Sequence, residues 1–122
     1  MSAKIDSYRD LVVWQQAMDL AVASYRATRN WPKEEIYGLT SQIRRAASSV
    51  PANIAEGFGR ENRGSYQQFL RIAQGSLKEL ETHLLISHRV GIASDEVIAP
   101  LMASSESVGK LLRFLIRKLS AG

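Results

Sequence analysis

The 122-residue chain contains no cysteine. Without thiols it has no disulfides, no thiolate metal ligands and no cysteine nucleophile, so packing must stabilise the fold. It also lacks any apolar run near the roughly 20 residues needed to cross a bilayer, and its start, MSAKIDSYRD, lacks the apolar core of a signal peptide. We therefore expect no membrane partner and a cytoplasmic location.

The composition predicts one ordinary globular domain over residues 1–122. Hydrophobic residues make up 45% of the chain and charged residues 23%, which is typical of a protein with a packed core. The formal net charge of +4 favours polyanionic partners. A charge this small also occurs in proteins that bind no polyanion, so it is suggestive only.

Four segments carry apolar residues at alternating three-and-four spacing, and none shows the alternation of a strand. The first segment begins with a capping-box spacing at Ser7 and Asp10, and its stripe is Leu11, Trp14, Met18, Ala21 and Tyr25. The predicted helices span residues 7–30, 39–60, 63–90 and 95–119. Because the links are short, we expect an all-α, antiparallel, up-down-up-down four-helix bundle.

Pro51 lies in the middle of the second predicted helix. A proline removes one backbone hydrogen bond and crowds the carbonyl four residues earlier, here that of Ala47, so a kink is expected. The alternative is a pair of helices that meet at Ser48 and Ser49.

No motif predicts phosphate-loop, nucleophilic or metal chemistry. The turn Gly57-Phe58-Gly59 lacks the third glycine of a dinucleotide fingerprint and follows a helix, which favours a simple exit turn. There is no Gly-x-Ser-x-Gly elbow and no Glu-x-x-His motif. Glu79 and His83 favour a surface pair over two metal ligands, and His88 is interpreted as a solvent-side histidine. We predict no enzyme and no cofactor, with a hydrolase or metal protein as the third alternative.

A polar stripe on the second helix is interpreted as an oligomer interface. Its members fall within roughly 60° on a helical wheel, beside the small residues Ala46 and Gly57: Gln42, Ser49, Asn53, Glu56 and Arg60. Polar groups of this kind, without lysine, suit a surface that another chain covers. The alternative is an exposed polar face, on which Glu56 and Arg60 are spaced for an ion pair.

Basic residues gather in three places, and we interpret them as candidate nucleic-acid contacts. They are Arg44 and Arg45 on the second helix, Arg60 and Arg63 (with Arg71 nearby) at the turn into the third, and Lys110, Arg113 and Arg117 on the fourth. Basic residues near a helix C-terminus are also favoured by the helix dipole, which explains part of the last group without any ligand.

Three sequence blocks resemble a known bacterial family. YGLTSQIRRA (residues 37–46), NIAEG (53–57) and GSLKELE (75–81) occur in order, within a similarity that runs from about Tyr8 to Gly91. They resemble the four-helix-bundle proteins named for intervening sequences of 23S ribosomal RNA.

The resemblance implies a left-handed antiparallel bundle that assembles into a homopentameric ring. A related branch serves as accessory proteins to the reverse transcriptases of diversity-generating retroelements, where a basic ring binds nucleic acid and the polymerase. No catalytic residue carries over. The expected partners are therefore other copies of the chain and RNA or a reverse transcriptase-like protein, with a protein-only scaffold as the alternative function.

Overall fold

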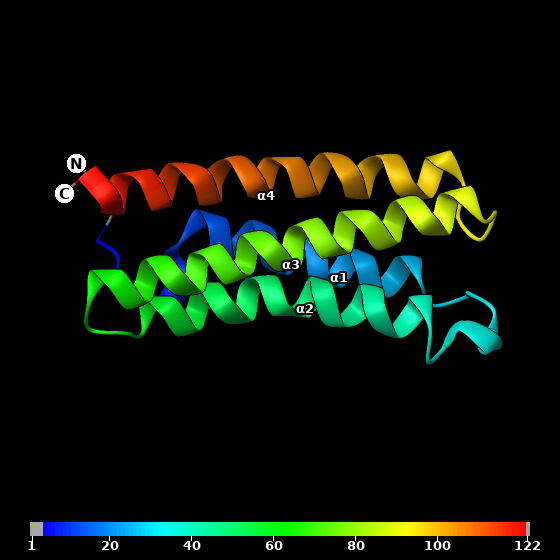
Figure 1. Ribbon diagram of the computed structural model, residues 1–122, viewed down its shortest axis with the longest axis horizontal. Helices are drawn as coiled ribbons and strands as arrows, with labels where there is room; N and C mark the ends of the chain where they lie inside the picture. Colours follow the sequence, from blue (N-terminus) through cyan, green and yellow to red (C-terminus); the bar gives the residue numbers. More distant parts are fainter. Residues whose placement is uncertain (1–3, 122) are drawn as a thin grey trace.

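Four α-helices make up most of the protein. The computed structural model describes residues 4–121. The helices are α1 (Val12–Ala27), α2 (Leu39–Phe58), α3 (Arg63–Arg89) and α4 (Asp95–Ala121), with short 3₁₀ turns η1 (Tyr8–Asp10) and η2 (Lys33–Glu35) (Figure 1). The described residues contain no strand, so the all-α prediction is confirmed. None of the helices in this part of the chain combines the length and the apolar character that crossing a membrane requires.

Each helix packs against two neighbours, α2 against α1 and α3, and α4 against α3 and α1. Side-chain bonds between neighbours join residues in opposite sequence order. Gln67, early in α3, donates to the Oγ of Ser120 near the end of α4, whereas Ser105 of α4 donates to Glu81, later in α3. The start of α1 and the end of α4 lie at the same end of the molecule (Figure 1).

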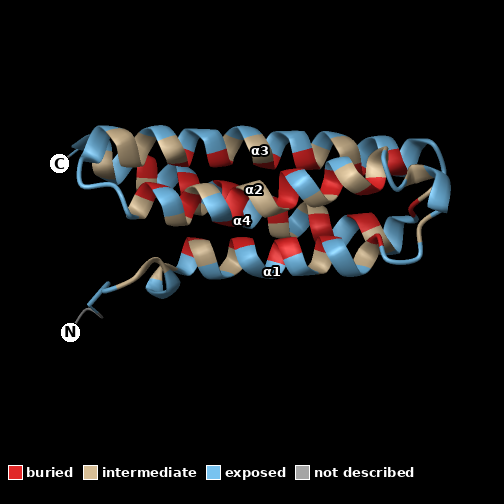
Figure 2. Ribbon diagram, turned by 90° about the horizontal axis from the view of Figure 1, so that it is seen from below, coloured by how far each residue is buried: buried red, intermediate tan, exposed pale blue. Residues whose placement is uncertain are grey.

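The core lies along the faces that the helices turn toward one another (Figure 2). The third helix shows why the sequence pattern works, since its buried apolar residues recur every three or four positions: Leu70, Ala73, Leu77, Leu80 and Leu84. This is the three-and-four spacing noted for the predicted segments, and each of the five side chains is almost fully removed from water. Burial of apolar area on this scale is the main favourable term in the stability of such a domain.

The predicted core stripe of the first helix is partly wrong. The residues that α1 buries are Val13, Ala17, Leu20, Ala21 and Ser24, whereas the predicted Met18 and Tyr25 are 37% and 45% exposed. This helix carries two apolar stripes, and periodicity alone favoured the more aromatic one. Ser24 is buried because its hydroxyl donates to the Leu20 carbonyl oxygen at 2.8 Å, which removes the cost of burying an unpaired hydroxyl.

The first helix is also shorter than residues 7–30. The capping box at Ser7 and Asp10 is present, but it caps the 3₁₀ turn η1. Leu11 then adopts an extended conformation (φ −74°, ψ 125°), so the α-helix begins at Val12 and ends at Ala27.

The second helix continues through Pro51 without interruption from Leu39 to Phe58. The alternative of two helices meeting at Ser48 and Ser49 is therefore wrong, and the kink stays a prediction. The helix ends at the expected place, where the Gly59 amide donates to the Ala55 carbonyl, and this confirms the exit-turn interpretation of Gly57-Phe58-Gly59.

Caps define both ends of α3. The Asn62 side chain accepts a hydrogen bond from the Ser65 amide at 2.7 Å, which satisfies one of the free amides of the first turn. After the last turn, Gly91 adopts a φ of +83°, a conformation that favours glycine. The chain then enters α4 without a long loop.

Two glycines inside helices differ sharply in their surroundings. A Cβ added at Gly57 of α2 would lie 2.8 Å from the Phe69 Cβ and 3.1 Å from the Tyr66 Cδ1 of α3, so the glycine permits close approach of these two helices. A Cβ added at Gly75 of α3 would meet nothing within 4 Å. Packing within the described chain thus explains the first glycine and not the second.

These surroundings predict opposite effects of alanine on stability. We expect Gly57→Ala to lower the free energy of unfolding by about 1–3 kcal/mol, because α2 and α3 must separate to admit the methyl group. Gly75→Ala should raise it by about 0.5–1 kcal/mol, because alanine is the better helix former. Urea unfolding followed by circular dichroism measures both, and a Gly57→Ala protein as stable as the unaltered one would contradict the close-packing argument.

Candidate nucleic-acid interface

Four residues of the predicted nucleic-acid set come from two parts of the chain that meet at one end of the bundle. Arg60 and Arg63 flank the turn between α2 and α3, and Arg113 and Arg117 lie in the last turns of α4. All four are exposed. The bond between Gln67 and Ser120 fixes the start of α3 beside the end of α4, which brings these groups into one region. Lys110, also exposed, lies one turn before Arg113.

Arg44 and Arg45 are separate from this region and differ from each other. The Arg44 Nε donates to the Thr28 Oγ1 at 2.9 Å, and its guanidinium carbon lies 4.9 Å from the centroid of the Tyr25 ring. Arg44 therefore packs α2 against the end of α1. Arg45 is exposed and lines a small polar groove between α2 and α3.

Arg60 already has partners within the chain. Its guanidinium forms an ion pair with Glu56 at 3.3 Å, one turn earlier, and lies 4.9 Å from the centroid of the Phe69 ring. The predicted pair between Glu56 and Arg60 is thus confirmed. Both side chains remain about half exposed, so solvent screening limits what the pair adds to stability.

Arg113 lies in a groove between α3 and α4 that the sequence did not predict. The groove has a volume of about 410 Å³, and Arg71 and Lys78 of α3 line its other side. Arg71 and Lys78 are seven residues apart on one helical face, and this spacing is the signal that could have indicated it. We refer to this groove as the α3–α4 basic groove.

The predicted oligomer interface lies along the boundary between α2 and α3. The Ser49 hydroxyl is 2.8 Å from the Ser76 hydroxyl, and the Asn53 amide donates to the Ser49 carbonyl and hydroxyl oxygens at 2.8 and 2.9 Å. These two polar groups find partners within the chain, so they do not need another protomer. Gln42 and Glu56 are exposed, and the interface stays a prediction.

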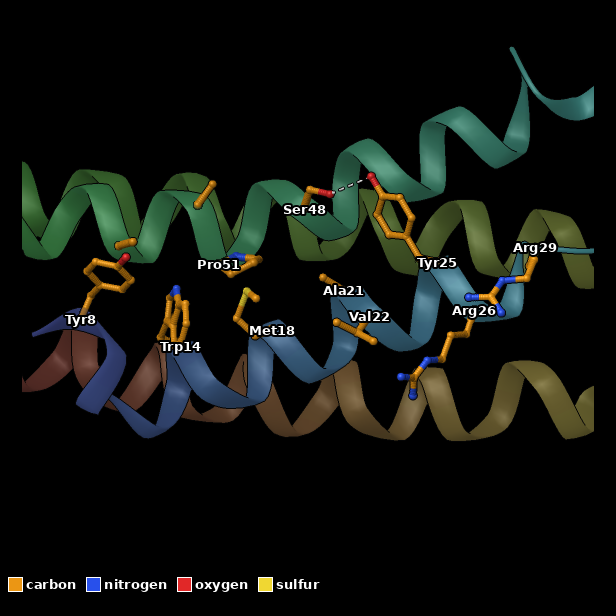
Figure 3. Close-up of a pocket in the computed structure, with 12 residues that line it drawn as sticks. Tyr8, Trp14, Met18, Ala21, Val22, Tyr25, Arg26, Arg29, Ser48 and Pro51 are labelled. Atoms are coloured by element: carbon orange, nitrogen blue, oxygen red, sulfur yellow. Dashed lines mark hydrogen bonds between the residues drawn. The ribbon is translucent and has the colours of Figure 1, made fainter.

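An open apolar groove lies between α1 and α2 (Figure 3). Its volume is about 610 Å³. Trp14, Met18 and Tyr25, which belong to the predicted core stripe of the first helix, line it from α1, and Pro51 lines it from α2. Arg26 and Arg29 lie toward one end (Figure 3). We refer to it as the α1–α2 apolar groove.

The histidines pair with carboxylates. His83 lies 3.7 Å from Glu79, as the spacing predicted. His88, expected to be a simple solvent-side histidine, has its Nε2 2.6 Å from an Asp95 oxygen, so it links the end of α3 to the start of α4. Among residues 4–121 no three potential metal ligands of the His, Cys, Asp or Glu type come together. Burial raises the pKa of the Tyr66 phenol above its ordinary value.

The comparisons with known proteins point to one family. Residues 9–113 match a family model described as 23S rRNA-intervening sequence protein, so the similarity extends past Gly91 and into α4. The chain is also similar to the solved structure of a protein of unknown function from the S23 ribosomal protein family of Bacteroides thetaiotaomicron. The two share 26% identity with a TM-score of 0.78, covering 86% of this chain and 98% of that one. A search among curated proteins found no match.

The different roles of the adjacent arginines can be tested by single substitutions. Arg44→Ala removes a hydrogen bond from a charged donor and a contact with the Tyr25 ring, so the free energy of unfolding should fall by about 1–2 kcal/mol. Arg45→Ala should change it by less than about 0.5 kcal/mol, as for other exposed positions. Chemical denaturation measures both, and equal effects would show that Arg44 is not part of the packing.

Proposed function

Since the chain belongs to the 23S rRNA-intervening sequence protein family, we propose that it is a non-enzymatic, homo-oligomeric bundle that binds structured RNA through pooled basic residues. The observation that carries the proposal is the gathering of basic side chains at one end of the bundle. Arg63, Arg113 and Arg117 are exposed there, with Arg71 close by in α3.

The chemistry of these side chains suits a phosphate backbone. Each guanidinium offers several N–H donors in a planar fork that matches two phosphate oxygens. Binding of this kind releases counterions and depends on charge more than on base sequence. The proposed ligand is therefore a structured RNA, free or in complex with a reverse transcriptase-like protein, and such a partner is consistent with a cytoplasmic location.

Oligomerisation strengthens the field that a single chain produces. The proposed unit is the antiparallel, up-down-up-down bundle, which the pairings of α3 with α4 support, and the proposed assembly is a homopentameric ring. Five copies of a chain with a formal net charge of +4 would carry about +20. The proposed contacts between protomers involve the polar stripe on α2, with Gln42 and the exposed pair of Glu56 and Arg60 at its free surface.

A protein-only scaffold is the second candidate, and the α1–α2 apolar groove favours it. Met18, Val22 and Tyr25 are each more than a third exposed on one face of α1. Apolar residues at this spacing beside an open groove suit the apolar face of a partner helix. In this case the positive charge would serve solubility and no RNA would bind.

The RNA-binding proposal predicts a steep dependence of affinity on salt. Fluorescence anisotropy with a structured RNA should show tight binding at low salt and weak binding at physiological salt. Arg113→Ala and Arg117→Ala should each bind less tightly than the unaltered protein. The slope of log affinity against log salt should become shallower by about one for each phosphate that a variant no longer neutralises.

A matched control separates local contacts from total charge. Arg29→Ala removes the same charge from a position just after α1 and should leave the slope unchanged, because the end of α1 and the end of α4 lie at opposite ends of the bundle (Figure 1). Absence of RNA binding even at low salt would overturn the proposal and favour the scaffold.

The oligomer interface predicts a change in mass. Glu56→Ala and Gln42→Ala should lower the oligomer order measured by light scattering, while circular dichroism shows an unchanged helical content. Glu106→Ala, an exposed carboxylate of α4 outside the stripe, is the control and should keep the full mass. If Glu56→Ala keeps it too, the stripe is not the interface.

A further inference from the structure

The α3–α4 basic groove combines positive charge with missing side-chain volume. Arg71 and Lys78 of α3 and Arg113 of α4 line it, together with Gly75 and Gly109. The two glycines lie on the two helices that form the groove. Basic residues also lie elsewhere on this surface, and in this groove they stand beside two helix-interior glycines.

The cations of the groove are incompletely neutralised. Within the described part of the chain, neither Arg71 nor Arg113 forms an ion pair shorter than 4 Å, and no carboxylate lines the groove. Lys78 is 3.2 Å from Glu81, but that carboxylate also accepts a hydrogen bond from Ser105 of α4. The groove therefore has a surplus of positive charge and of unused N–H donors.

The two glycines make room on both helices. Gly109 is buried, and a Cβ there would lie 3.4 Å from the Leu77 Cδ2 and 3.7 Å from an Arg113 guanidinium nitrogen, so Arg113 extends over the glycine backbone. Gly75 lies in the middle of α3, where a Cβ would touch nothing. A helix-interior glycine costs about 1 kcal/mol relative to alanine, and no contact within the described chain offsets that cost.

We propose that this groove binds a phosphate group, held by Arg71 and Arg113 and placed over Gly75. This site rests on the proposed function, so its phosphate belongs to an RNA backbone. A free phosphate compound is the other source of the same chemistry. The two guanidiniums supply forked N–H donors, and Lys78, although paired with Glu81, has further N–H donors to offer. The absence of a side chain at Gly75 lets a bulky tetrahedral anion approach the helix closely.

The first experiment uses Gly75→Ala, which fills the space and removes no charge. In the RNA anisotropy assay we expect affinity to fall several-fold while the salt slope stays nearly unchanged, because the cations remain. Arg71→Ala should instead lower the slope by about one and the affinity about tenfold. Because the alanine at position 75 favours the helix, weaker binding by that variant cannot be ascribed to unfolding.

Arg89→Ala is the matched control for Arg71. Arg89 is exposed on α3, eighteen residues after Arg71, which is five helical turns on the same face and about 27 Å away. The Arg89→Ala variant should bind RNA with the same affinity and salt slope as the unaltered protein. If RNA binds and the Gly75, Arg71 and Arg89 variants all behave alike, the groove is not the phosphate site, although the proposed function stands.

A second measurement separates failure of the groove from failure of the function. Pyrophosphate is titrated into the unaltered protein while the backbone amide signals of Gly75 and Gly109 are followed by nuclear magnetic resonance. Shifts at these amides, absent in Arg71→Ala, in a protein that binds no RNA would identify a free phosphate compound as the ligand and overturn the RNA proposal. No shift with pyrophosphate and no RNA binding would overturn both.

Discussion

The close packing of α2 against α3 is the constraint on which the positions of the functional residues depend. Gly57 admits the Phe69 and Tyr66 side chains at distances that no larger residue would allow, and the hydroxyls of Ser49 and Ser76 meet at the same boundary. These contacts fix the register of α3. Because the side chains of a rigid helix turn together, the register that buries Leu70 and Leu77 also determines that Arg71 and Lys78 face the side on which α4 lies.

The first helix, α1, packs against its neighbours with smaller side chains and leaves larger apolar side chains exposed. It buries small and medium side chains such as Ala17 and Leu20 and leaves Met18, Val22 and Tyr25 at the surface. Arg44 compensates by donating to Thr28 and covering the Tyr25 ring, which ties the end of α1 to α2. The bundle thus carries two unlike surfaces, an apolar one beside α1 and a basic one beside α4, and this division separates the two candidate functions.

Helix type and the core of α3 could be predicted from periodicity, because a single apolar stripe has only one face to bury. The same rule failed in part for α1, where two apolar stripes compete and the outcome depends on the size of the facing residues on other helices. The continuity of α2 through Pro51 was the leading prediction, whereas the partners of Ser49 and Asn53 could not be read from the sequence. The α3–α4 basic groove joins residues more than thirty positions apart, and no local pattern indicates which face of α4 meets which face of α3.

Three glycines inside helices differ in whether packing explains their presence. Gly57, Gly75 and Gly109 all break the preference of helix interiors for residues that favour the helix. Gly57 is explained by Phe69, whereas a Cβ at the buried Gly109 would lie at ordinary contact distance, 3.4 Å, from the Leu77 side chain. Gly75 has no such neighbour, so its cost to the helix is not offset by packing in the described monomer. Sequences tend to violate local preferences where function demands it, and this unexplained glycine lies between Arg71 and Lys78 in the α3–α4 basic groove.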